Sequence, residues 1–195
     1  MKIILASASP RRLEIMNNHG IDPIVMPSDC DETLTSDPSM TEAVENLSYR
    51  KAVACYESIK ADSVMADKYK GHLIIGADTI VYKDKILGKP LDADDARSML
   101  ESYRGTYHYV VTGITLIDYD SGVTDTLSDI TKVWCINYSD DEIEDYISGE
   151  EPYDKAGAYA IQGYFGRYID HIEGEYENVV GFPFYRIADK LKAYM

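Results

Sequence analysis

Residues 73–81 read Leu73-Ile74-Ile75-Gly76-Ala77-Asp78-Thr79-Ile80-Val81, an almost unbroken apolar run. Its length and its β-branched residues predict a buried strand, interrupted only by Gly76, Asp78 and Thr79. A carboxylate inside such a strand loses its hydration, which costs several kcal/mol unless the charge has a partner. Two interpretations of Asp78 stay open: a buried salt bridge with Lys51 or Lys89, or a functional carboxylate. In both cases we expect Asp78 not to tolerate substitution.

Upstream, one lysine falls on the apolar face of a predicted helix. Ser39 followed three residues later by Glu42 forms a capping box, and the helical pattern runs to about Ile59. Lys51 lies four residues after Leu47 on the apolar stripe. A lysine that points inward needs a partner or a ligand.

The N-terminal residues predict a strand, a tight turn and the start of a helix. Residues 2–6 form the strand, Ser9 is a natural N-cap and Pro10 a natural first helical residue. This arrangement points unpaired N–H groups and a positive dipole end at an anion. Arg11 and Arg12 are either solvated residues of the first turn or ligands of that anion. Two positive side chains at a helix N-terminus oppose the dipole, which favours an external anion.

The remaining pattern predicts one α/β domain over residues 1–195, an elongated mixed sheet with helices packed against it. The elements that we expect are a strand over 23–27, a polar surface loop over 60–71, a turn at 83–85, a helix over 92–104, a hairpin of strands 107–119 and 123–138, a capped helix from Ser139 to near Gly149, strands around 168–172 and a final helix from about Pro183.

Composition excludes several classes of protein. The chain has 34 acidic and 19 basic residues and a formal charge of −15, which argues against nucleic acid as a partner. A small polyanion is still possible, because a few cations in one cleft outweigh a distant acidic surface. No apolar run reaches the roughly 18 residues of a membrane span. The N-terminal run is too short for a signal peptide, so we expect a cytosolic protein with three reduced cysteines.

Other charged residues each leave two interpretations. Asp29, Asp31 and Glu32 either hold a divalent metal through their oxygens or form a solvated acidic loop. Lys89 is either a phosphate ligand or an exposed loop residue. The histidines lack the spacing of metal ligands, so none is assigned to a metal: His19, His72, His108 and His171.

Five motifs in order resemble those of the Maf family across almost the whole chain. Each alone is weakly specific, but their succession is highly specific. They are Leu5-Ala6-Ser7-Ala8-Ser9-Pro10-Arg11-Arg12, Gly76-Ala77-Asp78-Thr79, Leu87-Gly88-Lys89-Pro90, Asp154-Lys155-Ala156-Gly157-Ala158-Tyr159 with Ile161-Gln162-Gly163, and Asn178-Val179-Val180-Gly181 with Pro183.

The resemblance implies a fold similar to that of the inosine triphosphate pyrophosphatases. It also implies a cytosolic enzyme, often a homodimer, that hydrolyses the bond between the α and β phosphates of nucleotides with Mg²⁺ or Mn²⁺. By the same resemblance, Asp78 is the proton acceptor, and from these positions we expect Glu32 and Asp78 to help seat the metal. The residues of the polar cleft are Ser9, Arg11, Glu32, Lys51 and Lys89, with Arg12 beside them; the positions tied to substrate choice are Arg11, Thr79 and Gln162.

One branch of the family prefers dTTP and UTP, and another prefers 7-methyl-GTP. Lys155 followed by Gln162 resembles the first branch, and a neutral amide at Gln162 offers a donor and an acceptor to a pyrimidine edge. Two alternatives stay open: a pyrophosphatase directed at purine nucleotides, and a non-catalytic, nucleotide-binding regulator of cell division. Competition among dTTP, UTP, ITP and 7-methyl-GTP distinguishes the purine-directed enzyme from one that prefers pyrimidines. Nucleotide binding without release of pyrophosphate would favour the regulator.

Overall fold

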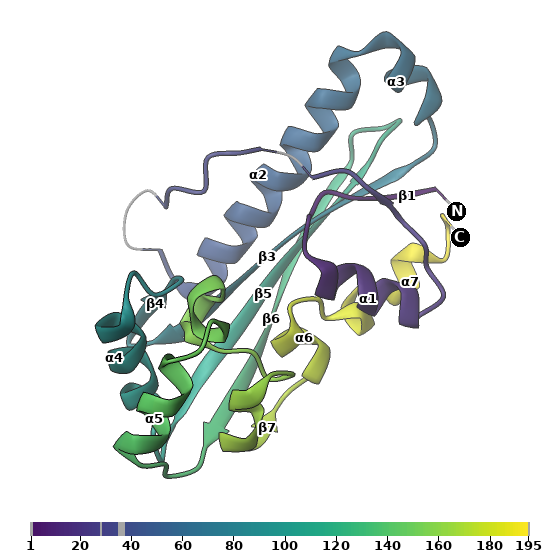
Figure 1. Ribbon diagram of the computed structural model, residues 1–195. Coiled ribbons are helices and arrows are strands. Elements are labelled where there is room, and N and C mark those ends of the chain that lie inside the picture. Colours follow the sequence, from purple (N-terminus) through teal and green to yellow (C-terminus); the bar gives the residue numbers. More distant parts are fainter. Residues whose placement is uncertain (1, 28, 35–37, 195) are drawn as a thin grey trace. The chain divides into compact units, whose positions relative to one another are not determined.

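The computed structural model describes residues 2–27, 29–34 and 38–194. Within these ranges the chain is an α/β protein with a mixed sheet of seven strands and helices packed on it, as the sequence predicts (Figure 1). None of the helices in these ranges is both long and apolar enough to cross a membrane. The strands are β1 (Ile3–Leu5), β2 (Ile24–Val25), β3 (Leu73–Lys83), β4 (Lys85–Leu87), β5 (Tyr107–Asp118), β6 (Thr124–Cys135) and β7 (Ile169–Glu173).

The helices alternate with the first strands and then follow the hairpin. The α-helices are α1 (Pro10–Asn18), α2 (Met40–Ala61), α3 (Ser63–Lys68), α4 (Ala93–Tyr103), α5 (Asp140–Ile147), α6 (Tyr176–Val180) and α7 (Ala188–Leu191). Four short 3-10 turns complete the described structure: η1 (Glu151–Asp154), η2 (Ala156–Ala158), η3 (Tyr164–Tyr168) and η4 (Phe184–Arg186).

The sheet is parallel at one end and antiparallel at the other. Its strand order is β2-β1-β3-β5-β6-β7, and β4 pairs with β3 beside this path. Strand β1 runs parallel to both β2 and β3, and parallel neighbours need crossover connections, which α1 and the α2–α3 segment supply. The β3–β4 and β6–β7 pairs are antiparallel. Alternating elements followed by a meander are therefore confirmed.

The chain divides into two compact units, and β3, β5 and β6 contribute residues to both. The first unit comprises Met1–Asp78, Thr112–Asp129 and Gly181–Met195, and the second comprises Thr79–Val111 and Ile130–Val180. The expectation of one domain over residues 1–195 stays a prediction.

In the first unit, the backbone of α2 lies directly on two glycines of the sheet. A Cβ built on Gly76 of β3 would lie 2.4 Å from the carbonyl oxygen of Ser48 and 2.7 Å from the nitrogen of Ala52. A Cβ on Gly113 of β5 would lie 2.3 Å from the carbonyl oxygen of Val44. Because a side chain at either position would push the helix away, these glycines set the distance between α2 and the sheet.

The apolar face of α2 then completes the core of this unit. Cys55 and Ile59 of the helix are buried against Ile4 of β1, Ile74 of β3 and Ile117 of β5. The apolar face of α2 thus meets the apolar residues of three neighbouring strands.

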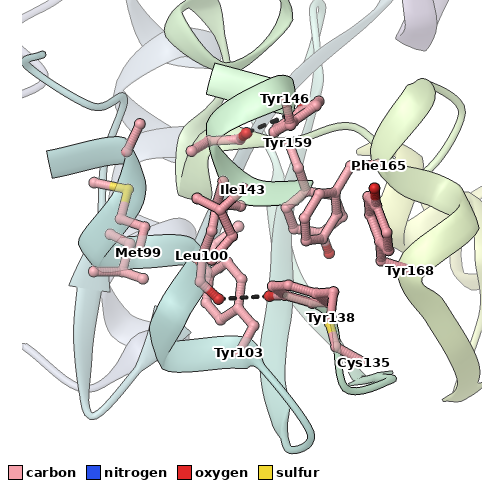
Figure 2. Packing of buried hydrophobic residues seen from close by; sticks show 14 of the residues in the cluster. Met99, Leu100, Tyr103, Cys135, Tyr138, Ile143, Tyr146, Tyr159, Phe165 and Tyr168 are labelled. Atoms are coloured by element: carbon pink, nitrogen blue, oxygen red, sulfur yellow. Dashed lines mark hydrogen bonds between the residues drawn. The ribbon is translucent and has the colours of Figure 1, made fainter. Parts of the chain in front are cut away.

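The core of the second unit is rich in tyrosine (Figure 2). A buried tyrosine needs a partner for its hydroxyl group, and most of these find a backbone carbonyl. Tyr138 donates to Leu100 O at 2.5 Å, while Tyr103 and Tyr146 donate to the carbonyls of Gly157 and Ala158 at 3.2 Å and 3.1 Å. Two core tyrosines therefore anchor one short segment of the chain.

A buried histidine completes this tyrosine core. His108 lies 2.6 Å from the hydroxyl oxygen of Tyr159 through its Nε2 atom. Burial, together with the charge of Lys83, lowers the pKa of His108 to about 3, so the ring is neutral. It packs against the rings of Tyr103 and Tyr159 and so belongs to the core of this unit.

Two expectations about secondary structure are wrong. The polar stretch 60–71 is not a loop: α2 runs to Ala61, and Asp62 caps α3 by accepting hydrogen bonds from the backbone nitrogens of Val64 and Met65. Its polar side chains are the solvated face of a helix, since no residue of α3 is buried. The final helix expected from about Pro183 is two short pieces, η4 and α7, which meet at Ile187.

We predict that Gly76→Ala destabilises the protein by about 1–3 kcal/mol or more, because the new methyl group meets helix backbone that has no freedom to rotate away. The free energy of unfolding from urea titration is the measurement. Gly88→Ala is the matched control, since a Cβ there meets nothing within 4 Å. Equal stability of the two variants would contradict the packing described for α2.

Candidate functional site

The centre of the candidate site is an ion pair between α2 and β3 in the first unit. Lys51 Nζ donates to Asp78 Oδ1 at 2.5 Å, and the two side chains are only 15% and 11% exposed. Asp78 lies two residues after Gly76 and thus on the same face of β3, toward α2. The close approach of the helix at Gly76 is what brings the Lys51 ammonium within reach. The charged partner that the sequence predicts for Asp78 is therefore Lys51, and the functional interpretation of Asp78 stays a prediction.

A second carboxylate meets the same ammonium group. Glu32 Oε1 lies 3.2 Å from Lys51 Nζ, although the Glu32 side chain is 63% exposed. Glu32 comes from the loop before α2, 46 positions before Asp78, so two carboxylates from distant segments converge on the Lys51 ammonium. The sequence predicts that Lys51 needs a partner, and the structure gives it two acidic partners, Glu32 and Asp78.

Glu32 and Asp78 also form a donor set that suits a hard divalent cation. Both offer carboxylate oxygens, and both already converge on one positive charge, that of Lys51. No group of three or more His, Cys, Asp or Glu side chains suited to a metal occurs among the described residues. A metal held here would therefore take its remaining ligands from water or from a bound ligand, as Mg²⁺ commonly does with phosphates.

The acidic loop does not itself build a metal site. Asp29, Asp31 and Glu32 are all exposed, and Asp31 Oδ1 accepts a hydrogen bond from the backbone nitrogen of Thr33 at 2.8 Å. The three carboxylates form no metal-binding group among the described residues, which favours the solvated-loop interpretation for Asp29 and Asp31.

The turn between β1 and α1 has the predicted capping. Ser9 is the N-cap of α1, and its hydroxyl accepts from the backbone nitrogen of Arg12 at 3.5 Å. Pro10 is the first helical residue. The backbone nitrogen of Ser9 in turn donates to the buried Ser7 hydroxyl at 3.3 Å, so the hydroxyl groups of Ser7 and Ser9 both close this turn.

Arg12 ties this turn to the rest of the first unit. Its Nη1 donates to Ala77 O at 2.8 Å and to Ser7 Oγ at 3.0 Å, and its Nε donates to Gly181 O at 2.9 Å. Burial lowers the pKa of Arg12, and the negative charge of Asp78 opposes that shift. Arg12 therefore holds three segments of the chain together immediately beside Asp78.

Arg11 has the opposite character. It is half-buried at the start of α1, and it forms no hydrogen bond or ion pair with the residues that the structure describes. Of the two arginines at this helix N-terminus, Arg11 is therefore the one whose guanidinium makes no bond within the described part of the chain, and it stays a predicted ligand for an anion.

Three further predicted residues belong to the second unit. Lys89 and Gln162 are exposed, and Thr79 is half-buried. The backbone nitrogen of Gly157 donates to Gly88 O at 2.9 Å. This bond joins the loop that carries Lys89 to the segment 154–159, so the structure brings together two of the five sequence motifs. The roles predicted for these residues stay predictions.

Lys155, which the sequence analysis used to choose the branch of the family, donates through Nζ to Glu151 O at 3.2 Å and to Asp154 Oδ1 at 2.5 Å. Sequence reasoning did not single out a second basic residue, Arg50. Arg50 donates to the carbonyls of Asp31 and Thr33 beside Glu32. No sequence pattern indicates this contact, because it joins a helix to an irregular loop.

Comparison with known proteins gives a consistent result over the whole chain. The family model described as Maf-like protein matches residues 2–194. A protein of Acetivibrio thermocellus named dTTP/UTP pyrophosphatase is 43% identical over 192 residues, which cover 98% of this chain and 94% of that protein. Proteins with the same name from Alkaliphilus oremlandii and Bacillus cereus are 40% and 38% identical, over 98% and 99% of this chain and 95% of each relative.

We predict that Arg12 and Arg11 differ in their effect on stability. Arg12→Met leaves the carbonyls of Ala77 and Gly181 without their donor, so the free energy of unfolding should fall by at least about 2 kcal/mol. Arg11→Met, the matched control one residue away, should change it by no more than about 0.5 kcal/mol. Urea unfolding followed by circular dichroism measures both, and equal losses would contradict the anchoring role of Arg12.

Proposed function

The chain belongs to the family of Maf-like proteins, and on this premise we propose that it hydrolyses dTTP and UTP to the monophosphate and pyrophosphate. One observation carries the proposal: the Lys51 ammonium lies between the carboxylates of Asp78 and Glu32, in a chain similar over its whole length to proteins named for this activity. The reaction is an attack of water on the α phosphorus, with cleavage of the bond to the bridging oxygen and departure of pyrophosphate.

A few cations suffice to bind a triphosphate on this acidic chain. Charges are screened over about 8 Å at physiological salt, so the formal charge of −15 acts weakly on a ligand that contacts its own cations. We assign the phosphate groups to Arg11, Lys51 and Lys89. Arg11 has no partner among the described residues, and Lys51 exchanges a carboxylate for a phosphate oxygen when substrate binds.

Asp78 is assigned the proton-accepting role. Its carboxylate is buried in β3, and its partner is the Lys51 ammonium. When Lys51 turns to a phosphate oxygen, that carboxylate is available to orient the attacking water and to take its proton. General base catalysis of this kind contributes about 10²–10⁴-fold to a rate. Ser9 shapes the turn beside it through its capping bond.

Glu32 and Asp78 are the residues that would hold Mg²⁺ or Mn²⁺. The donor set is all carboxylate, which matches the preference of these ions for oxygen ligands. When bound, the metal supplies positive charge to the phosphate oxygens, which is the main catalytic demand of phosphoryl transfer.

Substrate choice is assigned to Arg11, Thr79 and Gln162. The Gln162 amide is exposed in the second unit, and its carbonyl and NH₂ group supply an acceptor and donors suited to the O4/N3 edge of thymine or uracil. A carboxylate at this position would only accept hydrogen bonds, and it would suit guanine instead.

The setting of the activity is part of the proposal. The three cysteines are free thiols, which favours the reducing cytosol. The acidic charge argues against nucleic acid as a partner. The family resemblance favours a homodimer, which sedimentation equilibrium measures directly.

The first test is pyrophosphate release from a panel of dTTP, UTP, ITP and 7-methyl-GTP, with Mg²⁺ or Mn²⁺ and with EDTA. We expect kcat/KM for dTTP and UTP to exceed that for the purine nucleotides by at least about tenfold, the equivalent of about 1.4 kcal/mol. EDTA should abolish turnover, and added metal should restore it. Higher kcat/KM for ITP would favour the purine-directed alternative, and nucleotide binding without pyrophosphate release would favour the regulator.

Asp78→Asn tests the proton acceptor. The amide is nearly isosteric but takes up no proton, so kcat with saturating metal should fall by about 10²–10⁴-fold. Thermal unfolding checks that the variant folds. Asp29→Asn is the matched control, because Asp29 is an exposed aspartate outside the ion pair, and its turnover should match that of the unmodified chain. If Asp78→Asn keeps most of its turnover, Asp78 is not the base.

A further inference from the structure

The side chain of Glu32 makes few contacts that would hold it in the candidate site. It lies in a segment without helix or strand, and its carboxylate is 63% exposed. Among the described residues its only ion-pair partner is Lys51, at 3.2 Å, and Lys51 also lies 2.5 Å from Asp78. If Lys51 moves toward a phosphate, the side chain of Glu32 keeps no bond that would hold it in place.

The backbone around Glu32 is fixed by a different residue. Arg50 Nη1 donates to the carbonyl oxygen of Asp31 at 3.0 Å and to that of Thr33 at 2.8 Å. These are the residues on either side of Glu32. The Asp31 carboxylate closes the same turn by accepting from the backbone nitrogen of Thr33 at 2.8 Å. Glu32 therefore lies at the tip of a turn whose two flanks are joined by one guanidinium.

We infer that Arg50 is a positioning residue, which keeps the Glu32 carboxylate beside Asp78 independently of Lys51. Helix α2 holds Glu32 twice: Lys51 pairs with its side chain, and Arg50 binds the backbone on both sides of it. Because consecutive residues of one helix make these two contacts, the loop follows the same rigid element that carries Lys51.

The inference rests on the proposed function, in which Lys51 is drawn to substrate and Glu32 helps to seat the metal. It adds that two adjacent basic residues, Arg50 and Lys51, have different roles in the site. Lys51 is released from carboxylates when substrate binds, whereas the hydrogen bonds of Arg50 with described residues go to backbone carbonyls, which substrate does not replace. Residues that orient a metal ligand typically change metal affinity or activity by about 10–100-fold when removed.

The test compares Arg50→Met, Arg50→Lys and a control. Arg50→Met keeps the length of the side chain and removes its donors, so we expect kcat/KM for dTTP to fall by about 10–100-fold and the Mn²⁺ concentration for half-maximal turnover to rise. Arg50→Lys keeps a charge and donors and should recover part of the loss. Arg186→Met removes another arginine that donates to a backbone carbonyl, that of Ser128, and should leave both values unchanged.

A double-mutant cycle separates positioning from general stability. If Arg50 acts through Glu32, then Arg50→Met should cost little further activity in a Glu32→Gln background. Losses that add in the double variant, or unchanged kinetics in Arg50→Met, would overturn the inference. Mn²⁺ affinity measured by electron paramagnetic resonance, with a dTTP analogue whose α–β bridge resists hydrolysis, gives a readout that does not depend on turnover and should weaken in Arg50→Met.

Amide hydrogen exchange distinguishes a failure of this inference from a failure of the proposed function. Exchange at Thr33, whose N–H is bonded to Asp31, should be faster in Arg50→Met than in the unmodified chain. An unmodified chain that releases no pyrophosphate would defeat the proposed function, and exchange alone would then decide the positioning role. Unchanged exchange at Thr33 would overturn that role whatever the activity.

Discussion

The site depends on how closely the backbone of α2 lies to β3. Gly76 lets the helix backbone at Ser48 and Ala52 come to a distance that any side chain would prevent. Asp78, on the same face two residues later, then lies within 2.5 Å of the Lys51 ammonium. A buried carboxylate without its cation would be strongly destabilising, so packing and chemistry constrain each other here. Gly76 sets the distance between α2 and β3, and that distance allows Lys51 and Asp78 to form their ion pair.

The basic residues around this pair divide into those that hold the fold and those that face outward. Arg12 and Arg50 bind backbone carbonyls and join distant segments of the first unit. Arg11 has no partner in the described structure. Lys51 belongs to both groups in the proposed function, since it pairs with two carboxylates and is the residue that we propose exchanges one of them for a phosphate. In a chain of formal charge −15, each cation that the fold itself does not use matters for binding a polyanion.

In the second unit, some motif residues lie in segments that no long helix or strand holds in place. Buried tyrosine hydroxyls supply hydrogen bonds that a strand or helix would otherwise make, and Tyr103 and Tyr146 donate to the carbonyls of Gly157 and Ala158. Gly157 has a φ of 71°, and a Cβ there would lie 2.7 Å from Val81. Glycine is therefore required at this position both by the backbone conformation and by the close packing.

The sequence by itself determined the α/β class, the long strands, the capping boxes and the N-cap at Ser9, because each depends on periodicity or on neighbours three or four residues away. It also indicated that Asp78 and Lys51 need charged partners, because burial of a charge can be read from its apolar neighbours. Only the tertiary structure decided that they pair with each other and that Arg12 and Arg50 bind carbonyls of distant segments. Such contacts join residues far apart in the chain, and no local pattern records which segments packing will bring together.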